Sequence, residues 1–155
     1  MKYFILLFFL ISAQANAQNK KVAKANKLKT SVVTKTENNK TTNDKKTTFD
    51  KNGNETETID YNKDGEIKTI HRLKYNNEGD EIEDFEYNGN NILVEKKITK
   101  YNLMGEKIEE DYLDVTDKLT KKYVYTYDGK GLKTERKMTD ATGKVTSVKH
   151  YTYTK

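Results

Sequence analysis

Apolar and polar residues alternate with a period of two along most of residues 49–155. This period is typical of short β-strands with one covered face. An apolar residue also stands two positions before many of the aromatic residues, as in the pairs Ile59 and Tyr61 or Leu73 and Tyr75. The segment contains no proline and no long stretch with helical periodicity. We therefore predict that residues 49–155 form one all-β domain.

A turn motif interrupts the alternation at regular intervals. It consists of an aromatic residue, Asn or Asp, two variable residues and Gly, as in Tyr61-Asn62-Lys63-Asp64-Gly65. Asn or Asp suits the start of a type I turn, and Gly suits a left-handed backbone at its end. Together they indicate a three-residue hairpin loop that ends in a β-bulge. In such a loop, Tyr61 is expected to pair with Ile67 across the hairpin.

The spacing of the motif predicts how the strands are arranged. Copies begin at positions 49, 61, 75, 87, 101, 115, 127 and 139, with a ninth at Tyr151, and the step from one copy to the next is always 12 or 14, hence even. Since side chains alternate between the two faces of a sheet, even steps are expected to keep the turn aromatics on one face. Turns this short can only reverse the chain, so we predict an antiparallel meander of about eight strands, in an open or curled sheet.

The N-terminal residues indicate export. Lys2 precedes an apolar run over residues 3–11, and Ala15-Asn16-Ala17 has the pattern of a cleavage site. The run is about half the length that a membrane-spanning helix needs, so residues 1–17 are predicted to be a signal peptide and not an anchor. Cysteine is absent, which excludes a lipid-modified cysteine and disulfides. The protein is expected in the periplasm, outside the cell or at the cell surface.

Residues 18–48 differ in composition from the rest of the chain. They carry nine lysines, two acidic residues and no aromatic residue. With Lys2 they account for +8 of the formal charge, so the net +5 of the whole chain leaves −3 for residues 49–155. Few large apolar side chains are present to offset the entropy of ordering, so a disordered basic tail is predicted. It could serve as a spacer or attract anionic envelope polymers; without arginine or aromatics, it is not expected to bind nucleic acid.

Candidate catalytic residues are scarce. The histidines His71 and His150 lie far apart in the sequence, and Ser147 and His150 would point to opposite faces of a strand. The acidic residues stand among lysines, which favours cross-strand charge pairs over a glycosidase pair. Acidic turns such as residues 50–55 could suggest calcium, but they fit neither the EF-hand loop nor the RTX nonapeptide, and turn formation explains them. We predict no catalytic site, no metal site and no cofactor.

The aromatic residues at the turns are the candidate ligand-binding residues. Tyrosine presents a flat apolar ring and a polar hydroxyl, which suits contact with sugars or with another protein. An alternative is that these rings supply the buried area of a domain with few aliphatic residues. The predicted ladder comprises Tyr61, Tyr75, Tyr87, Tyr101, Tyr127 and Tyr151.

The motif resembles a known family. Tyr125-Thr126-Tyr127-Asp128-Gly129-Lys130-Gly131 is similar to the YD repeats of Rhs-type and insecticidal-toxin-complex proteins. The resemblance covers residues 49–155 and implies strips of β-hairpins, which in that family form a shell around a toxin. This chain has shorter repeats, too few copies to enclose anything, and no Gly-Arg at the start of its strands.

These observations favour a non-enzymatic exported protein. We expect a module associated with the envelope or the cell surface that binds polysaccharide or another envelope protein. The alternatives are an accessory protein of a YD-repeat toxin or secretion system, or a degenerate enzyme.

Overall fold

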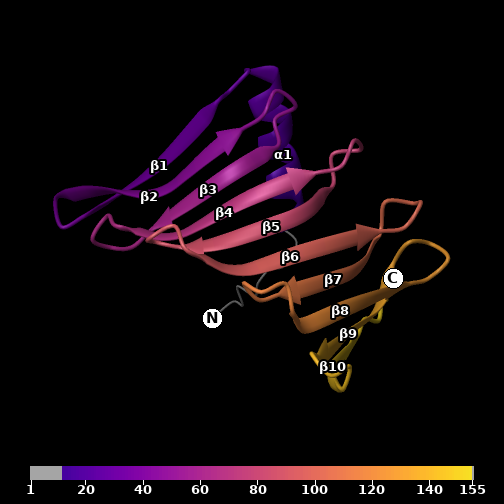
Figure 1. Cartoon of the computed structure of the whole chain (residues 1–155). Coiled ribbons are helices and arrows are strands. Elements are labelled where there is room, and N and C mark those ends of the chain that lie inside the picture. Colours follow the sequence, from indigo (N-terminus) through magenta and orange to yellow (C-terminus); the bar gives the residue numbers. More distant parts are fainter. Residues whose placement is uncertain (1–11, 155) are drawn as a thin grey trace, which may run out of the picture.

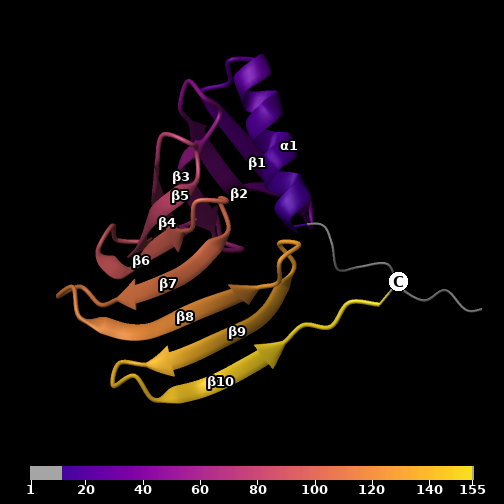
Figure 2. The same cartoon turned by 90° about the vertical axis from the view of Figure 1, so that its right-hand side faces the viewer.

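The computed structural model describes residues 12–154, which form one helix and a single antiparallel sheet (Figure 1). The ten strands lie side by side in sequence order, so the predicted meander is confirmed. The sheet is open and strongly twisted (Figure 2). The elements are α1 (Ser12–Ala25), β1 (Thr30–Glu37), β2 (Lys40–Phe49), β3 (Glu55–Tyr61), β4 (Ile67–Tyr75), β5 (Glu81–Asn88), β6 (Leu93–Tyr101), β7 (Lys107–Leu113), β8 (Leu119–Tyr127), β9 (Lys133–Asp140) and β10 (Val145–His150).

The sheet has ten strands and not the predicted eight, because the segment expected to be a disordered tail supplies β1 and most of β2. These strands join through Asn38 and Asn39, both in the left-handed region at φ 49° and 63°. Asn tolerates this conformation, which a two-residue hairpin turn requires. The prediction of disorder was wrong because it assumed that a segment needs a hydrophobic core in order to be ordered. A Thr-rich hairpin at the edge of an existing sheet can form through backbone pairing with its neighbour, and its β-branched residues favour the strand conformation.

The helix α1 docks at the turn ends of the N-terminal strands (Figures 1 and 2). Ala23 is only 2% exposed, and the Lys20 ammonium donates a hydrogen bond to the Gly79 carbonyl at 3.2 Å. Gly53 leaves no space there for a side chain, since a Cβ atom would lie 2.3 Å from the Lys20 carbonyl oxygen. Most of the predicted signal peptide lies outside the described residues, and residues 12–17 form the first part of α1.

The predicted hairpin loops are confirmed. The Gly65 amide donates to the Asn62 carbonyl at 3.0 Å, and the Asn62 amide donates to the Glu66 carbonyl at 2.9 Å. The Asn62 side-chain oxygen accepts from the Asp64 and Glu66 amides, both at 2.9 Å. Gly65 has φ 87°, a conformation in which other residues are strained. The same backbone pattern recurs in all eight turns from β2–β3 to β9–β10, with Asn91 and Asp117 replacing Gly in two of them.

The predicted pairing of Tyr61 with Ile67 is also confirmed. The prediction that all turn aromatics lie on one face of the sheet is not. Asp60 pairs with Thr69, so Lys68 is an extra residue between two cross-strand pairs. Every hairpin from β2–β3 onward contains this second bulge. One inserted residue exchanges the two faces of a strand. The turn aromatics therefore alternate between the faces, and the prediction from even steps was wrong.

The underlying repeat comprises two strands and two turns of different kinds. Turn pairs of one kind are Phe49 with Glu55, Tyr75 with Glu81, Tyr101 with Lys107 and Tyr127 with Lys133. Turn pairs of the other kind are Tyr61 with Ile67, Tyr87 with Leu93, Leu113 with Leu119 and Thr139 with Val145. The turn thus begins after Leu113 and not after Val115. The position predicted for Tyr151 belongs to Tyr153, which follows Tyr127 at the same interval as Tyr127 follows Tyr101.

The sheet is a single layer with little core. Among the apolar residues whose burial is described, Ala23, Ile70 and Tyr125 form the buried set. Most strand residues are half-buried on one face or the other. Charge pairs connect neighbouring strands, as between Arg72 and Glu57 at 3.1 Å and between Lys74 and Glu83 at 2.9 Å. The aliphatic parts of such side chains cover the sheet while their charged ends stay in water. No helix among residues 12–154 is long and apolar enough to span a membrane.

Candidate ligand-binding face

Cross-strand pairing assigns the predicted tyrosines to two faces. Thr58 pairs with His71, and Tyr75 follows His71 at a distance of four residues along β4, so these side chains share one face. The paired residues Ile59 and Ile70 lie on the other face. We call the first face the tyrosine face; it carries Tyr75, Tyr101, Tyr127, Tyr112, Tyr123 and Tyr125.

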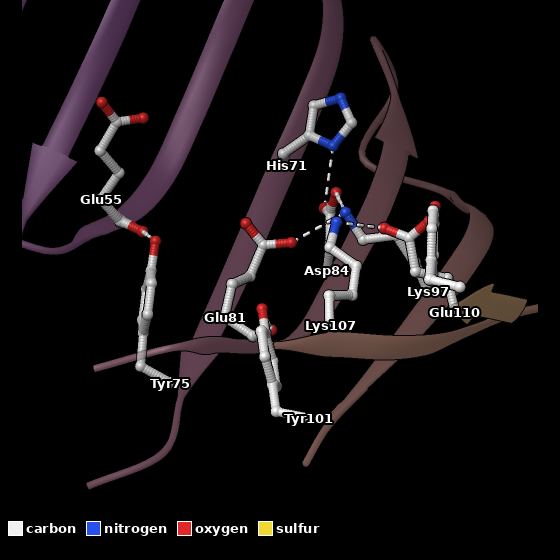
Figure 3. A network of polar contacts seen from close by, with 10 residues as sticks. Glu55, His71, Tyr75, Glu81, Asp84, Lys97, Tyr101, Lys107 and Glu110 are labelled. Atoms are coloured by element: carbon white, nitrogen blue, oxygen red, sulfur yellow. Dashed lines mark hydrogen bonds and ion pairs between the residues drawn. The ribbon is translucent and has the colours of Figure 1, made fainter. Parts of the chain in front are cut away.

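Four tyrosines occupy the same position of successive repeats and form what we call the tyrosine row: Tyr75, Tyr101, Tyr127 and Tyr153. Each hydroxyl donates a hydrogen bond to the backbone carbonyl of the residue 20 positions earlier. The acceptors are Glu55 at 2.8 Å, Glu81 at 3.0 Å, Lys107 at 2.7 Å and Lys133 at 2.9 Å. Figure 3 shows Tyr75 and Tyr101 in this arrangement.

These hydrogen bonds compensate for the end of the backbone ladder. Pairing between β3 and β4 begins at Glu57 and Arg72, so on this side of β3 the Glu55 carbonyl lies beyond the last pair with β4. The Tyr75 hydroxyl supplies the donor that the strand does not. A carbonyl left without a donor in a half-buried place would be costly. The row therefore has a structural role, and its rings are held in fixed positions.

The remaining residues of the predicted ladder lie outside the tyrosine row, and two of them lie on the opposite face. Tyr61 and Tyr87 are on the opposite face, where the Arg72 guanidinium lies 4.5 Å from the Tyr87 ring centre. Tyr151 is the repeat equivalent of Tyr125, and the Lys133 ammonium lies 5.7 Å from its ring centre. Four of the six residues predicted to form one ladder thus share the tyrosine face, namely Tyr75, Tyr101, Tyr127 and Tyr151, and two do not.

Sequence reasoning did not identify Tyr112 and Tyr123, two further aromatic residues of the tyrosine face. The rings of Tyr112 and Tyr123 meet edge to face, with their centres 5.6 Å apart. Cationic side chains lie over them: the Lys121 ammonium is 4.1 Å from the Tyr112 ring centre, and the Arg136 guanidinium carbon is 5.1 Å from that of Tyr123. These contacts stabilise the rings on the sheet surface. Assigning Tyr112 and Tyr123 to this face requires the strand register with its bulges, which the sequence pattern did not reveal.

A network of charged side chains lies beside the row (Figure 3). His71 Nδ1 contacts Asp84 Oδ1 at 2.9 Å, and the Lys97 ammonium contacts both Asp84 Oδ2 at 3.3 Å and Glu81 Oε1 at 2.8 Å. On the next strands, Glu110 accepts a hydrogen bond from the Tyr125 hydroxyl and pairs with the Lys107 ammonium at 2.6 Å. Three strands, β4 to β6, supply the first cluster, and cross-strand register aligns their side chains.

The contacts of the network shift the pKa values of His71 and Asp84. The hydrogen bond to Asp84 raises the pKa of His71 above its ordinary 6.5, although burial acts in the other direction. Burial would raise the pKa of Asp84, but the hydrogen bond from His71 and the charge of Lys97 outweigh it, and the pKa falls below 3.8. Burial and the neighbouring Glu81 raise the pKa of Tyr101 to about 12. Tyr101 is therefore neutral at physiological pH and its hydroxyl remains a hydrogen-bond donor.

A cavity of about 410 Å³ lies between Lys20 of α1 and the tyrosine face. His71, Tyr75 and Asp84 line it, together with Asn54 at its turn end. Asn54 is 5% exposed, and its side-chain oxygen has no hydrogen-bond partner within residues 12–154. Tyr75 belongs both to this cavity and to the tyrosine row, so the two are continuous.

Among residues 12–154, no hydroxyl side chain forms a hydrogen bond with His71 or Asp84. Thr58 stands opposite His71 in the ladder, but no hydrogen bond joins them in the described part of the chain. A nucleophile needs its base within hydrogen-bond reach. No group of three or more His, Asp or Glu side chains among residues 12–154 is arranged to hold a metal ion. The arrangement is suited to holding polar molecules against fixed aromatic rings.

Comparison with known proteins gives no identification. No protein family and no curated protein matches the chain. The chain is similar to part of a crystal structure of a GtfA/B complex bound to UDP and GlcNAc, with 12% sequence identity and a TM-score of 0.30. The match covers 77% of this chain and 24% of that one, so the chain spans about a quarter of its length. A likeness this low carries no functional inference, and the resemblance to YD repeats stays a prediction.

Proposed function

We propose that the protein is an exported, non-enzymatic module that binds linear polysaccharide of the cell envelope through its tyrosine face. The tyrosine row is the observation that supports this proposal. Neighbouring strands of a sheet lie about 4.8 Å apart, so tyrosines on every second strand recur at about 10 Å. This is comparable to the length of a disaccharide. A linear polymer laid across the strands would meet equivalent rings at each repeat.

The way the rings are held also favours binding. Each hydroxyl of the row is committed to a backbone carbonyl, so the ring has few conformations to lose when a ligand contacts it. The hydroxyl oxygen still has lone pairs that can accept a hydrogen bond from a sugar. Tyr75, Tyr101 and Tyr127 are half-buried, and Tyr153 is 54% exposed, which leaves part of each ring available.

The surrounding charges suit a polyhydroxylated ligand. Glu81, Asp84 and Glu110 are acceptors, and Lys97 and Lys107 are donors, all beside the row. Such a mixed surface provides both hydrogen-bond donors and acceptors for sugar hydroxyl groups, without a strong net charge. The basic residues of the 18–48 segment add an electrostatic attraction to acidic envelope polymers.

Co-sedimentation with insoluble polysaccharides and with cell-envelope fractions tests the proposal, at low and at high salt. We expect the protein to pellet at both salt concentrations. The double variant Tyr101→Ala with Tyr127→Ala should lose most of this binding. The matched control, Tyr61→Ala with Tyr87→Ala, changes the opposite face and should retain it. Equal loss in both variants, or binding that salt abolishes, would contradict a role for the tyrosine face.

A further inference from the structure

The strand β1 presents an open edge. It pairs with β2 on one side, and no strand within residues 12–154 pairs with its other side. All eight of its residues are exposed, and Val32 and Val33 are 52% and 50% exposed. Its only charged residues, Lys35 and Glu37, lie 2.8 Å apart and neutralise each other. Proteins usually protect such an edge with unpaired charges, prolines or bulges. Residues 30–34 of β1 contain neither a charge nor a proline, and the one bulge in the pairing of β1 with β2 has its extra residue, Asp44, on β2.

The opposite edge of the sheet contains an incomplete strand. The strands β4, β6 and β8 each have nine residues, whereas the equivalent β10 has only six. The residues that continue β10 are Tyr151-Thr152-Tyr153, identical to Tyr125-Thr126-Tyr127 at the end of β8. In β8 these residues pair with β9. In β10 the equivalent residues have no strand to pair with in the described part of the chain.

Two hydrogen bonds nevertheless hold residues 151–153 in place beside β9. The Tyr151 amide donates to the Thr134 carbonyl at 3.0 Å, and the Tyr153 hydroxyl donates to the Lys133 carbonyl at 2.9 Å. Both contacts attach residues 151–153 to β9 on their inner side. Their outer backbone groups are left to water or to another strand.

We propose that a second copy of this chain docks its β1 against β10, so that copies join head to tail into a longer sheet. The sheet has ten strands in alternating directions, so β1 runs in the direction that an eleventh strand would have. The contact would therefore be antiparallel, like every pair within the chain. It would repeat the junctions β2–β3, β4–β5, β6–β7 and β8–β9, each an even strand followed by an odd one.

This geometry favours head-to-tail contact over pairing of two β1 strands. A β1–β1 contact would satisfy one edge and leave residues 151–153 without a partner. A heterologous contact satisfies both edges and does not close by itself, so assembly can continue.

Proline variants test the contact because each removes one outward-facing donor. The Phe49 amide donates to the Lys29 carbonyl, and bonded pairs alternate along an antiparallel ladder, so the Val32 amide points away from β2. By the same alternation from Tyr151 and Thr134, the Val148 amide points away from β9. Val32→Pro and Val148→Pro therefore block one edge each without removing a hydrogen bond within the sheet. Val32→Lys and Val148→Lys place a charge at the same edges and keep the backbone donor.

Sedimentation velocity of the purified protein over a range of concentrations gives the readout. We expect the sedimentation coefficient of the unmodified protein to rise with concentration, and each edge variant to remain monomeric. A mixture of Val32→Pro and Val148→Pro should form dimers and nothing larger, since each variant retains the edge that the other has lost. Val115→Lys, at a turn residue that is 58% exposed, is the control and should assemble normally.

Three results would overturn the proposal. The unmodified protein could remain monomeric at every concentration. Assembly could survive Val148→Pro or Val148→Lys, which would indicate pairing of two β1 strands. Assembly could also survive both substitutions at Val32, which would assign the contact to another surface.

Discussion

The hydroxyl of Tyr101 donates a hydrogen bond at 3.0 Å to the backbone carbonyl of Glu81, two residues beyond the point where pairing of β5 with β6 begins. Three other tyrosines make the same bond, each at the equivalent position of its own repeat. One side chain therefore ends the ladder in each repeat and places an aromatic ring on the sheet surface. Stability and the proposed binding surface depend on the same residues, and substitutions can separate the two.

Tyr101→Phe removes the hydrogen bond and keeps the ring. We expect the free energy of unfolding to fall by about 1 kcal/mol, because the Glu81 carbonyl loses a partner in a half-buried place. Urea denaturation measures the change. Tyr61→Phe is the control, since the Tyr61 hydroxyl has no hydrogen-bond partner in the described structure, and its effect should stay within about 0.5 kcal/mol. Equal effects of the two variants would contradict the role given to the row.

Substitutions at two glycines near hairpin turns distinguish the cost of backbone strain from the cost of a steric clash. Gly105 has φ 77° and Gly129 does not have a positive φ, and a Cβ atom at either would meet nothing within 4 Å. Gly105→Ala should destabilise the protein by about 1 kcal/mol, since alanine is strained at positive φ. Gly129→Ala should be neutral or stabilise slightly, because it reduces the freedom of the unfolded chain. Thermal or urea unfolding of both variants tests this, and a destabilising Gly129→Ala would be inconsistent with the described turn.

Docking of α1 depends on the absence of a side chain at Gly53. A Cβ atom there would lie 2.3 Å from the Lys20 carbonyl oxygen, whereas at Gly143, with a similar φ of 85°, it would meet nothing. Gly53→Ala should therefore detach the helix, and Gly143→Ala should cause only the backbone strain of about 1 kcal/mol. Trypsin should cleave after Lys20, Lys21 and Lys24 faster in Gly53→Ala than in Gly143→Ala. Equal cleavage rates would show that α1 does not pack against this turn.

The pair of His71 and Asp84 predicts a pH dependence of stability. The raised pKa of His71 means that its contribution is complete below its ordinary pKa of 6.5 and is lost as the pH rises through the raised value. The lowered pKa of Asp84 means that its contribution is present above 3.8 and is lost as the pH falls through the lowered value. His71→Asn should therefore cost more stability near pH 5.5 than near pH 8. Urea titrations at the two pH values test this, and a cost independent of pH would exclude a charged pair.

The turns and the local pairing could be predicted from the sequence because their physics is local. Asn62 and Gly65 specify the loop by themselves, and the loop fixes the pairing of Tyr61 with Ile67. The exchange of faces could not be predicted in this way. It depends on an extra residue in each hairpin, such as Lys68, whose only sequence signal is that Ile82, Val94 and Ile108 break the alternation at equivalent positions.

The candidate site was predicted in composition but not in arrangement. Tyr75, Tyr101 and Tyr127 were identified as a set, whereas Tyr61 and Tyr87 lie on the opposite face because of the bulges. The pair of His71 and Asp84 was missed because the two residues are 13 positions apart and meet only through the register of β4 with β5. Disorder was predicted for residues 18–48 from the lack of large apolar side chains, but a single-layer sheet orders its edge hairpin without them.

An NMR titration of protein with labelled tyrosine rings tests the central claim most directly. Soluble fragments of the polysaccharide that the protein sediments with would be added stepwise. We predict that the signals of Tyr75, Tyr101 and Tyr127 shift together while those of Tyr61 and Tyr87 stay in place, because only the first three lie on the tyrosine face. Shifts of Tyr61 and Tyr87 alone, or binding without a shift of any tyrosine in the row, would contradict recognition by the tyrosine face.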